Sequence, residues 1–334
     1  MPSFAVLGSG GWGTAMALVL AQRSGADVRL WCARAETGQQ IRERRENVRQ
    51  LPGVTIPPEI LVTTDPAEAI AGADCWVAAV PMAFLRETLV RLKPFAGGDV
   101  PVVSLTKGIE VATFLRPTEV IGEVLGVSRL VAVSGPSHAE EVARGLPTSV
   151  VAACPDAELA GWVQDQFGTD RLRVYTNADL VGVELAGALK NVIGLAAGIC
   201  DGLQFGDNAK ASLITRGLVE MTRFGVAHGA TPATFGGLAG LGDLIATCFS
   251  SHGRNRRAGE RLARGESLTE VVAGPQVVEG AYTARSVYNR TTGAGLDAPI
   301  MTAVYRILYE GLSPHGAVQD ILSRPQKGES TFLG

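Results

Sequence analysis

The 334-residue sequence has few of the residues that build disulfides, metal sites or strongly charged surfaces. Its five cysteines are odd in number and form no Cys-x-x-Cys pair, and its four histidines lack metal-ligand spacing. We therefore expect neither a disulfide framework nor a metal, and cysteines that are buried in a reducing compartment. The net charge of −3 gives no electrostatic reason to expect nucleic acid or a membrane surface as a partner.

We also expect neither a membrane-spanning hydrophobic run nor an export signal in the sequence. No apolar run is expected to approach the ~20 residues that span a bilayer. The N-terminus lacks a basic region followed by an apolar core and a small-residue cleavage site. A hydrophobic content of 46% with 19% charge indicates a globular protein with ample core, and the length suits about two domains. We expect a soluble, cytoplasmic protein without membrane insertion.

Glycine is plentiful, and the first glycines of the chain form an ordered motif. The apolar residues 4–7 end in Gly8-Ser9-Gly10-Gly11-Trp12-Gly13, and a helical pattern follows. Gly8 would allow a tight turn, Gly10 the close approach of the backbone to a pyrophosphate, and Gly13 the packing of helix on strand. The phosphates would lie at the helix N-terminus. The strand before and the helix after favour a dinucleotide site over a glycine-rich turn without function.

The residue that follows the second strand bears on the choice of cofactor. Residues 28–32 form this predicted strand, and an Asp or Glu at its end would hold the ribose 2′-hydroxyl of NAD. The chain has Ala33 and Arg34 there, with Glu36 two residues later. Arg34 can face a 2′-phosphate, so NADP(H) is favoured and NAD(H) is possible, although a charge at a loop start is often only solvated.

Strand-like and helical segments alternate through the first half of the chain. This pattern indicates a doubly wound, mainly parallel sheet, with ligands beyond the carboxyl ends of its strands. We predict an α/β Rossmann-type N-terminal domain of residues 1–178, followed by an all-α C-terminal domain of residues 179–334. Further strands are predicted at residues 60–63, 75–80, 102–105, 130–133, 149–152 and 172–175.

Polar or turn-forming residues follow three of these strands. Pro81 can end strand pairing and turn the chain over the cofactor. Lys107 places a cation where a nicotinamide or substrate would lie, and Gly135 permits close backbone approach. Ser137 suits a helix N-cap whose free amides would face an anion. Each of these has a structural explanation by itself, but together on one sheet edge they indicate a site. His138 has no orienting partner at catalytic spacing and is interpreted as structural.

The predicted helix over residues 180–199 carries an unusual face. Lys190 and Asn191 lie within a stripe of small residues, and interior glycines cost about 1 kcal/mol each relative to alanine, so another body should pack closely there. One interpretation is a helix-crossing notch with Lys190 reaching solvent. The alternative is that Lys190 and Asn191 face the cleft between the domains. The glycines of the stripe are Gly187, Gly194 and Gly198.

Other polar groups of the helical half are possible partners. The glycine-rich residues 236–242 end in Asp243, which would need a partner if buried, and a lysine is the natural one. Residues 250–257 are the densest positive cluster and precede a helical run, so amides and guanidinium groups could bind a dianion. A solvated surface is the alternative. A further amphipathic helix is expected at residues 213–227. Two more are expected within residues 299–322, where they would form a subunit interface.

Together these motifs resemble the bacterial NAD(P)-dependent glycerol-3-phosphate dehydrogenases. The resemblance covers essentially the whole chain, and the ordered set of motifs is highly specific. The stretches that carry it are residues 8–15, 106–108, 134–137, 187–191, 213–217, 239–243, 254–257 and 277–280.

This resemblance implies reversible reduction of dihydroxyacetone phosphate to sn-glycerol 3-phosphate, a phospholipid precursor, by a homodimer that needs no metal. It implies that Lys190 is the catalytic acid and base. The implied substrate contacts are Lys107, Gly135, Ser137, Lys190, Asn191, Asp243, Gly253, Arg254 and Asn255. The implied cofactor contacts are Gly8, Gly10, Gly11, Trp12, Gly13, Arg34, Lys107, Ala139, Arg254, Val277 and Glu279.

Two positions depart from the family pattern. Many relatives carry a histidine where this chain has Ala33, which removes one possible adenosine-ribose contact. Many carry a hydroxyl residue where this chain has Gly253, which removes a phosphate-binding hydroxyl but keeps the backbone amide.

Two alternative functions make different demands on these residues. A reductase of a β-hydroxy acid or a ketopantoate-like substrate would need a carboxylate site, and it would not need a phosphate cradle at Arg254 and Asn255. A non-enzymatic redox sensor would not require Lys190 and Asp243 together, and would typically add a nucleic-acid-binding module.

Overall fold

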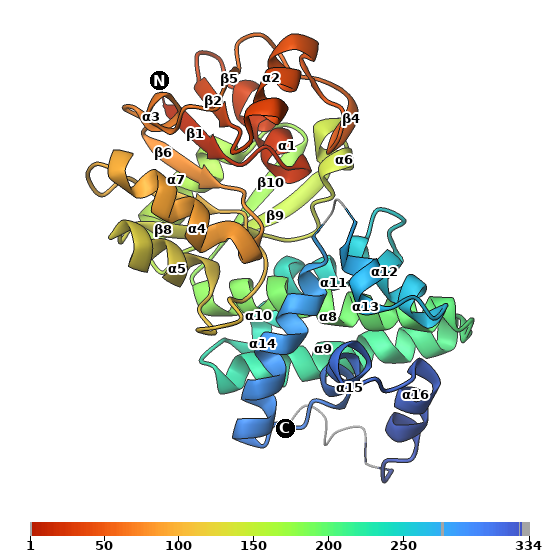
Figure 1. Ribbon diagram of the computed structural model, residues 1–334. Helices are drawn as coiled ribbons and strands as arrows, with labels where there is room; N and C mark the ends of the chain where they lie inside the picture. Colours follow the sequence, from red (N-terminus) through yellow and green to blue (C-terminus); the bar gives the residue numbers. More distant parts are fainter. Residues whose placement is uncertain (1, 275–276, 327, 329–334) are drawn as a thin grey trace. The chain divides into compact units, whose positions relative to one another are not determined.

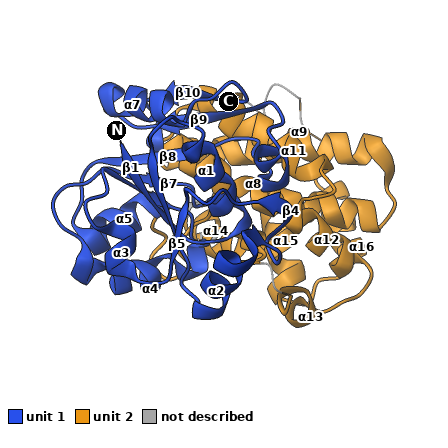
Figure 2. Ribbon diagram, turned by 90° about the horizontal axis from the view of Figure 1, so that it is seen from above, with its two compact units in different colours: residues 1–107, 116–180 blue, residues 108–115, 181–334 orange. Residues whose placement is uncertain are grey.

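The computed structural model describes residues 2–274, 277–326 and 328 of the chain. Figure 1 labels the helices and strands. The chain divides into two compact units, which Figure 2 colours separately: residues 1–107 with 116–180, and residues 108–115 with 181–334. The segment 108–115 lies in the first domain of the sequence-based division but groups with the second unit. Its Ile109 belongs to the second hydrophobic core, and the Ile109 carbonyl accepts a hydrogen bond from Ser286 Oγ at 3.2 Å.

Eight strands form the sheet of the first unit, in the order β10-β9-β8-β7-β6-β1-β2-β5. Neighbouring strands from β5 to β8 pair in parallel, so the predicted mainly parallel Rossmann-type sheet is confirmed. Residues 4–7 of the central strand β1 have no exposed surface, as expected for a sheet covered on both faces. The strands are β1 Ser3–Leu7, β2 Asp27–Trp31, β5 Leu61–Thr63, β6 Cys75–Ala78, β7 Val102–Ser104, β8 Leu130–Ser134, β9 Thr148–Ala153 and β10 Leu172–Asn177.

The direction of the sheet reverses between β8 and β9, which pair antiparallel. The two strands are joined through α6, Ala139–Ala143, which has only five residues. In this pairing Ser134 lies opposite Val151 and Ala132 lies opposite Ala153, so β9 starts near the edge of the sheet where β8 ends.

The remaining elements of the first unit include a hairpin that the sequence pattern did not indicate. It consists of β3, Glu46–Asn47, and β4, Leu51–Thr55, which pair antiparallel. The helices of this unit are α1 Gly11–Ala21, α2 Ala35–Arg44, α3 Pro66–Ile70, α4 Met82–Leu92, α5 Pro117–Leu125, α6, and α7 Ala157–Phe167, with a short 3-10 turn at Lys93–Phe95.

The described part of the second unit is helical, as predicted. It has a π-helical segment, η2, at Leu238–Gly242. The α-helices are α8 Leu180–Gly202, α9 Gly206–Ala227, α10 Pro232–Phe235, α11 Asp243–Phe249, α12 Arg254–Ala263, α13 Leu268–Val272, α14 Glu279–Ala294, α15 Pro299–Tyr309 and α16 Pro314–Leu322.

Helix α8 corrects the expectation that no apolar run approaches the length of a membrane span. It has 23 residues and a mean hydropathy of 1.5 over its most apolar window, which is enough by length and composition. However, 83% of that window is buried inside the structure. Its apolar composition is therefore that of a core helix, around which the second hydrophobic core is built.

The predicted close packing on α8 is present, and the packing body is α12. A Cβ at Gly198 would lie 1.8 Å from the Arg256 carbonyl oxygen, and one at Gly259 would lie 2.1 Å from the Leu195 carbonyl oxygen. These distances are far below van der Waals contact, so the two helices approach through their backbones. Glycine at these positions therefore places the N-terminus of α12 beside the middle of α8.

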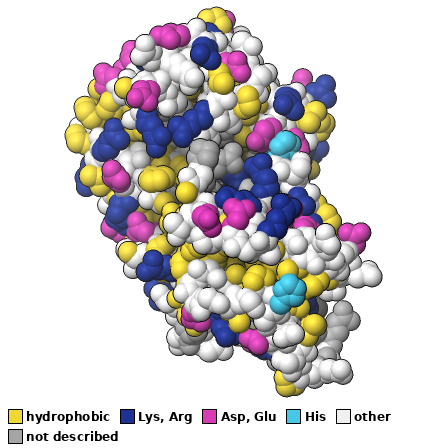
Figure 3. Space-filling view, turned by 45° about the vertical axis from the view of Figure 1, so that its right-hand side comes forward, with side chains coloured by type: hydrophobic (Ala, Val, Ile, Leu, Met, Phe, Trp, Pro, Cys, Tyr) yellow, Lys and Arg dark blue, Asp and Glu magenta, His cyan; other side chains and the backbone are white. Residues whose placement is uncertain are grey.

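The cysteine and charge expectations can be compared with the structure. All five cysteines are free thiols in buried positions, as predicted. Burial raises the pKa of the Cys248 thiol to about 12. Within the described residues, no three His, Cys, Asp or Glu side chains gather as metal ligands. Figure 3 shows positive and negative side chains interspersed on the visible face, as the small net charge suggests.

Candidate active site

The glycine turn in the first unit has the geometry that its sequence suggests. Gly8 has φ +117°, a conformation that side chains rarely adopt, and its amide donates to the Trp31 carbonyl. A Cβ at Gly13 would lie 2.0 Å from the Gly8 carbonyl oxygen, so helix α1 packs against the end of β1. A Cβ at Gly10 would meet no atom within 4 Å. The backbone at Gly10 is therefore open to a ligand.

The N-terminus of α1 offers donors towards that open side. Gly11, Trp12 and Gly13 are its first three residues, whose amides lack intrahelical acceptors. The buried Trp12 indole Nε1 has no hydrogen-bond partner within the described residues. Ala139 lies close by, because a Cβ at Gly11 would be 3.4 Å from its side chain. These features fit a pyrophosphate at the turn.

The end of β2 carries the residues that bear on cofactor choice. Arg34 is exposed and is the N-cap residue of α2, with an extended backbone and no side-chain capping bond. Ala33 beside it is also exposed. Arg34 thus lies between β2 and α2, where the βαβ pattern predicts the residue that bears on cofactor choice.

Lys107, Gly135 and Ser137 form one cluster in the first unit. The Lys107 ammonium donates to the Gly135 carbonyl at 2.9 Å and lies 3.4 Å from Ser137 Oγ. Ser137 Oγ also donates to the Gly135 carbonyl at 2.9 Å. The predicted N-cap role of Ser137 is wrong, because the N-cap of α6 is His138 and Ser137 turns back to the strand end. The loop ends of β7 and β8 are thereby joined.

The second unit contains a buried ion pair at the middle of α8. Lys190 is 7% exposed and Asp243 is 2% exposed. The Lys190 ammonium donates to Asp243 Oδ1 at 2.5 Å and to Thr247 Oγ1 at 2.8 Å. Lys190 therefore does not reach solvent, which rules out that interpretation of the notch. A buried charge pair is costly to form and needs such a complete set of bonds.

Thr247 is a site residue that the sequence analysis missed. It follows Asp243 by one helical turn on α11, so both oxygens lie on the same face of that helix. The residue is buried, and its methyl group lies where a Cβ at Gly194 would approach within 2.7 Å. The four-residue spacing from Asp243 was the available signal, but a threonine in a helix is too common to be singled out by it.

Asn191 and Asn255 join α8 to α12. Asn255 Nδ2 donates to Asn191 Oδ1 at 2.9 Å, and Asn255 Oδ1 accepts from the Gly280 amide at 2.9 Å. Asn191 Nδ2 donates to the Gly187 carbonyl at 3.3 Å. Both side chains are buried and make bonds within the unit. A series of hydrogen bonds made by these two side-chain amides therefore links α8, α12 and the start of α14.

The basic cluster divides between a helix start and internal ion pairs. Gly253 is the N-cap of α12, and Arg254 and Asn255 are its first two residues. Arg256 turns away from any common anion site, because its guanidinium pairs with Asp201 at 2.6 Å and with Glu260 at 2.8 Å. Of the arginines in the cluster, Arg256 is therefore engaged in ion pairs within the unit.

The last two predicted cofactor contacts lie at the start of α14. Glu279 is its first residue and Val277 precedes it by two positions. A Cβ at the adjacent Gly280 would lie 2.5 Å from the Asn191 carbonyl oxygen, so the start of α14 lies against α8. Val277 and Glu279 are therefore held near Asn191 within the second unit.

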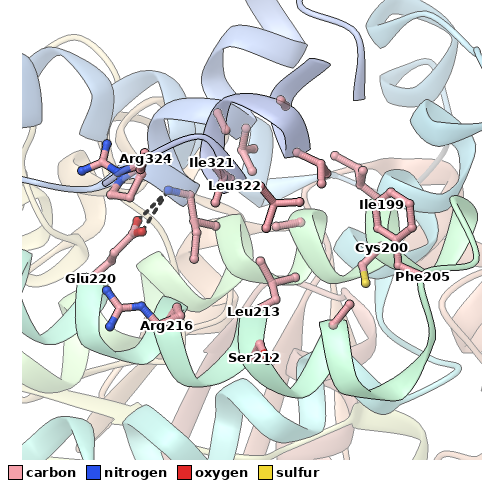
Figure 4. A pocket seen from close by; sticks show the side chains of 18 of the residues that line it. Ile199, Cys200, Phe205, Ser212, Leu213, Arg216, Glu220, Ile321, Leu322 and Arg324 are labelled. Carbon is pink, nitrogen blue, oxygen red and sulfur yellow. Dashed lines mark hydrogen bonds between the residues drawn. The ribbon is translucent and has the colours of Figure 1, made fainter. Parts of the chain in front are cut away.

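A cavity of about 530 Å³ in the second unit lies apart from these residues. It is lined mainly by apolar side chains of α8, α9, α15 and α16, with Arg216, Glu220 and Arg324 at one end, as Figure 4 shows. None of the predicted site residues lines it. The cavity is therefore separate from the Lys190 cluster.

Comparisons with known proteins identify the family. Residues 3–160 match the model of the NAD-dependent glycerol-3-phosphate dehydrogenase N-terminus, and residues 179–319 match that of its C-terminus. The glycerol-3-phosphate dehydrogenase (NAD(P)+) of Chlorobium limicola is 47% identical over 329 residues, which cover 97% of this chain and 98% of the relative. The enzyme of the same name from Geobacillus thermodenitrificans is also 47% identical, and the match covers 100% of this chain and 98% of that relative.

Solved structures agree with the sequence relatives. The crystal structure of glycerol-3-phosphate dehydrogenase from Coxiella burnetii has a TM-score of 0.92 and 38% identity, covering 97% of this chain and 99% of that one. The structure of a ketopantoate reductase from Ralstonia eutropha is 16% identical, with a TM-score of 0.60. The match covers 92% of this chain and 97% of that one, and it shows a shared fold alone. The chain belongs to the NAD-dependent glycerol-3-phosphate dehydrogenase family.

Proposed function

We propose that this chain reduces dihydroxyacetone phosphate reversibly to sn-glycerol 3-phosphate, with Lys190 as the acid and base of the reaction. Its family membership makes it an NAD(P)-dependent oxidoreductase. The observation that carries the assignment of Lys190 is its buried ammonium, 2.5 Å from Asp243 and 2.8 Å from Thr247. The product would supply the backbone of glycerophospholipids.

The first unit would hold the cofactor. Gly8, Gly10 and Gly13 shape the turn, and the amides at the start of α1 would bind the pyrophosphate. Gly11, Trp12 and Ala139 would contact the dinucleotide from around this turn. Val277 and Glu279 at the start of α14 are the remaining proposed cofactor contacts. When bound, the nicotinamide supplies or accepts the hydride. The cofactor preference proposed from Arg34 is NADP(H).

Lys190 would supply the proton chemistry. Addition of hydride to a ketone builds negative charge on its oxygen, which a nearby cation stabilises and an acid must protonate. The Lys190 ammonium can polarise the carbonyl and then donate its proton. In the oxidative direction the neutral amine takes the alcohol proton back. Asp243 and Thr247 would fix the direction of the ammonium throughout the cycle.

Arg254 and the N-terminus of α12 would bind the phosphate group of the substrate. The amides of the first turn and the helix dipole favour an anion there. The amide that follows Gly253 would add to this set even though Gly253 brings no hydroxyl. Asn255 is also a proposed substrate contact, and its bonds to Asn191 and to the Gly280 amide would hold it at the start of the helix. Binding energy from this remote phosphate can orient the reacting carbon.

The remaining proposed substrate contacts are Lys107, Gly135, Ser137 and Asn191. The Lys107 ammonium, placed by the Gly135 carbonyl, would lie near the substrate oxygens or the nicotinamide. A cytoplasmic location and a homodimer complete the proposal, supported by free buried cysteines and by the resemblance to dimeric enzymes.

The assay that tests this function follows oxidation of NADPH and NADH by the purified protein. We expect turnover with dihydroxyacetone phosphate and much less with unphosphorylated dihydroxyacetone, because the latter lacks the group that Arg254 and α12 bind. Absence of turnover with the phosphorylated ketone and either cofactor would refute the proposal.

A further inference from the structure

The β3–β4 hairpin lies against the glycine turn, although neither the sequence motifs nor the proposed mechanism involves it. Its strand β4 packs on α1 and α6, which are its neighbours in Figure 1. Leu51 and Ile56, both 1% exposed, anchor it in the first hydrophobic core. The hairpin is therefore fixed beside the segment that would hold the pyrophosphate.

Asn47 connects this hairpin to the turn. The residue is 2% exposed. Its Nδ2 donates to the Ser9 carbonyl at 2.8 Å and to Thr14 Oγ1 at 2.9 Å, while its Oδ1 lies 3.3 Å from the Gln50 amide. The Asn47 oxygen thus bonds to the hairpin, and the Asn47 nitrogen bonds to the glycine turn and to helix α1. A buried amide used in this way satisfies two groups that belong to the motif itself.

The contact with Ser9 determines the orientation of one amide in the motif. The Ser9 carbonyl and the Gly10 N–H belong to a single planar trans peptide, in which the oxygen and the hydrogen point in opposite directions. Asn47 holds the oxygen, so the Gly10 N–H points away from the hairpin. A Cβ at Gly10 would meet no atom within 4 Å, so the backbone around this donor is open.

The hairpin backbone also restricts the next residue of the motif. A Cβ at Gly11 would lie 2.9 Å from the Gln50 carbonyl oxygen. Gln50 is the residue whose amide Asn47 Oδ1 faces. Asn47 therefore contacts both the Ser9–Gly10 peptide of the turn and the hairpin residue whose carbonyl faces Gly11.

We propose that Asn47 is a positioning residue for cofactor binding, which preorganises the glycine turn through Ser9 and Thr14. This inference rests on the proposed dinucleotide site. The ligand chemistry it serves is the diphosphate of a dinucleotide, which needs amides that already point outward when it arrives. Preorganisation of this kind lowers the cost of binding and leaves the reacting groups unchanged.

The test compares Asn47→Asp with the wild-type protein. The carboxylate keeps the shape and the acceptor for Gln50 but cannot donate to the Ser9 carbonyl. We expect the Kd for NADPH, measured by calorimetry, to rise about tenfold, as for the loss of a buried hydrogen bond. The KM for dihydroxyacetone phosphate at saturating cofactor and the kcat should stay within about twofold.

Matched variants separate this effect from general loosening of the unit. Thr14→Val removes one of the two acceptors and should raise the cofactor Kd by about threefold, whereas Thr14→Ser keeps it and should leave the Kd unchanged. Asn177→Asp alters another asparagine of the same unit, whose Oδ1 accepts from the Asp179 amide on the outer strand β10, and should leave the Kd unchanged.

Two outcomes would overturn the inference. One is an unchanged cofactor Kd in folded Asn47→Asp and Thr14→Val. The other is a parallel rise in the cofactor Kd and the substrate KM, which a purely structural role would produce. If Asn47→Asp does not fold, the contrast between Thr14→Val and Thr14→Ser decides. Failure of the wild-type protein to bind NADPH or NADH would instead refute the proposed function.

Discussion

Thr247 gives Lys190 a second fixed oxygen besides the carboxylate of Asp243. One carboxylate alone would let the ammonium rotate about the ion pair, whereas two oxygens one helical turn apart define its direction. A proton donor must lie within hydrogen-bond reach of the atom it serves, so its direction affects the rate. We therefore place Thr247 in the catalytic cluster.

Thr247→Val removes the hydroxyl and keeps the branched shape. We expect kcat to fall about tenfold, as for the loss of one buried hydrogen bond, while cofactor affinity persists. Thr222→Val is the matched control, because that hydroxyl donates only to the Leu218 carbonyl within α9. Equal kcat values for the two variants would remove Thr247 from the cluster.

Arg254→Ala should act mainly on substrate affinity. Loss of a charge-assisted bond to phosphate predicts a rise of roughly 10- to 100-fold in the KM for dihydroxyacetone phosphate. The exposed Arg257 on the same helix is the control, and its alanine variant should change the KM little. An unchanged KM in Arg254→Ala would show that this residue does not bind the phosphate.

Arg34→Asp should change cofactor preference. An aspartate after β2 would repel a 2′-phosphate and can accept from a ribose 2′-hydroxyl. We expect the ratio of kcat/KM for NADPH over NADH to fall about tenfold or more relative to the wild-type protein. Arg44→Asp at the exposed end of α2 controls for the change in charge. The same ratio in all three proteins would mean that Arg34 is only solvated.

At the scale of the elements, Glu220 joins α9 to α15. Its carboxylate accepts from the Ile300 amide at 2.9 and 3.1 Å and from the Met301 amide at 3.1 Å, bonds that Figure 4 shows in part. It thereby caps the first turn of α15 from a neighbouring helix. Burial raises the pKa of Glu220 to about 7, against the opposing effect of these amides.

This pKa has a consequence for stability. Between pH about 4.5 and 7 the folded protein binds more protons at Glu220 than the unfolded chain does, so the free energy of unfolding falls as the pH rises through that window. The change is at most about 3 kcal/mol. Glu220→Gln should remove this contribution, as measured by urea denaturation at pH 5 and pH 8.

The comparison needs a control for the other titrating groups. Glu310 is exposed at the end of α15, and Glu310→Gln should keep the wild-type pH dependence. Because the remaining groups are shared, the difference between the two variants isolates Glu220. If Glu220→Gln loses stability between pH 5 and pH 8 as steeply as the wild-type protein, the carboxyl group does not titrate in that range.

Elements with a strong apolar period could be predicted from the sequence, and those held by side chains could not. The central strands β1 and β6 and helix α8 are apolar and buried, so their pattern was sufficient. The hairpin is short, contains Pro52 and Gly53, and is linked to the glycine turn by the side chain of Asn47. Helix α9 begins at Gly206 and not at 213, because its polar first turns are held by the Lys210 ammonium on Asp201.

At the scale of the whole molecule, the predicted site residues are divided between the two units. The glycine turn, Lys107, Gly135 and Ser137 belong to the first unit. Lys190, Asp243 and Arg254 belong to the second. The order of these motifs along the chain was enough to indicate the family, because each motif has its own spacing. The hydrogen bonds around these motifs could not be predicted from the sequence, because Thr247 and Asn47 bond to residues that are distant along the chain.

The central claim is that Lys190 performs the proton chemistry, and its removal tests this most directly. Because Lys190→Ala alone would leave Asp243 buried and unpaired, the variant to use is Lys190→Ala with Asp243→Asn. Its control is Asp243→Asn alone. We predict a loss in kcat of at least about 10³-fold for the double variant, with the Kd for NADPH within about threefold of wild type. A folded double variant whose kcat remains within tenfold of the wild-type value would contradict the claim.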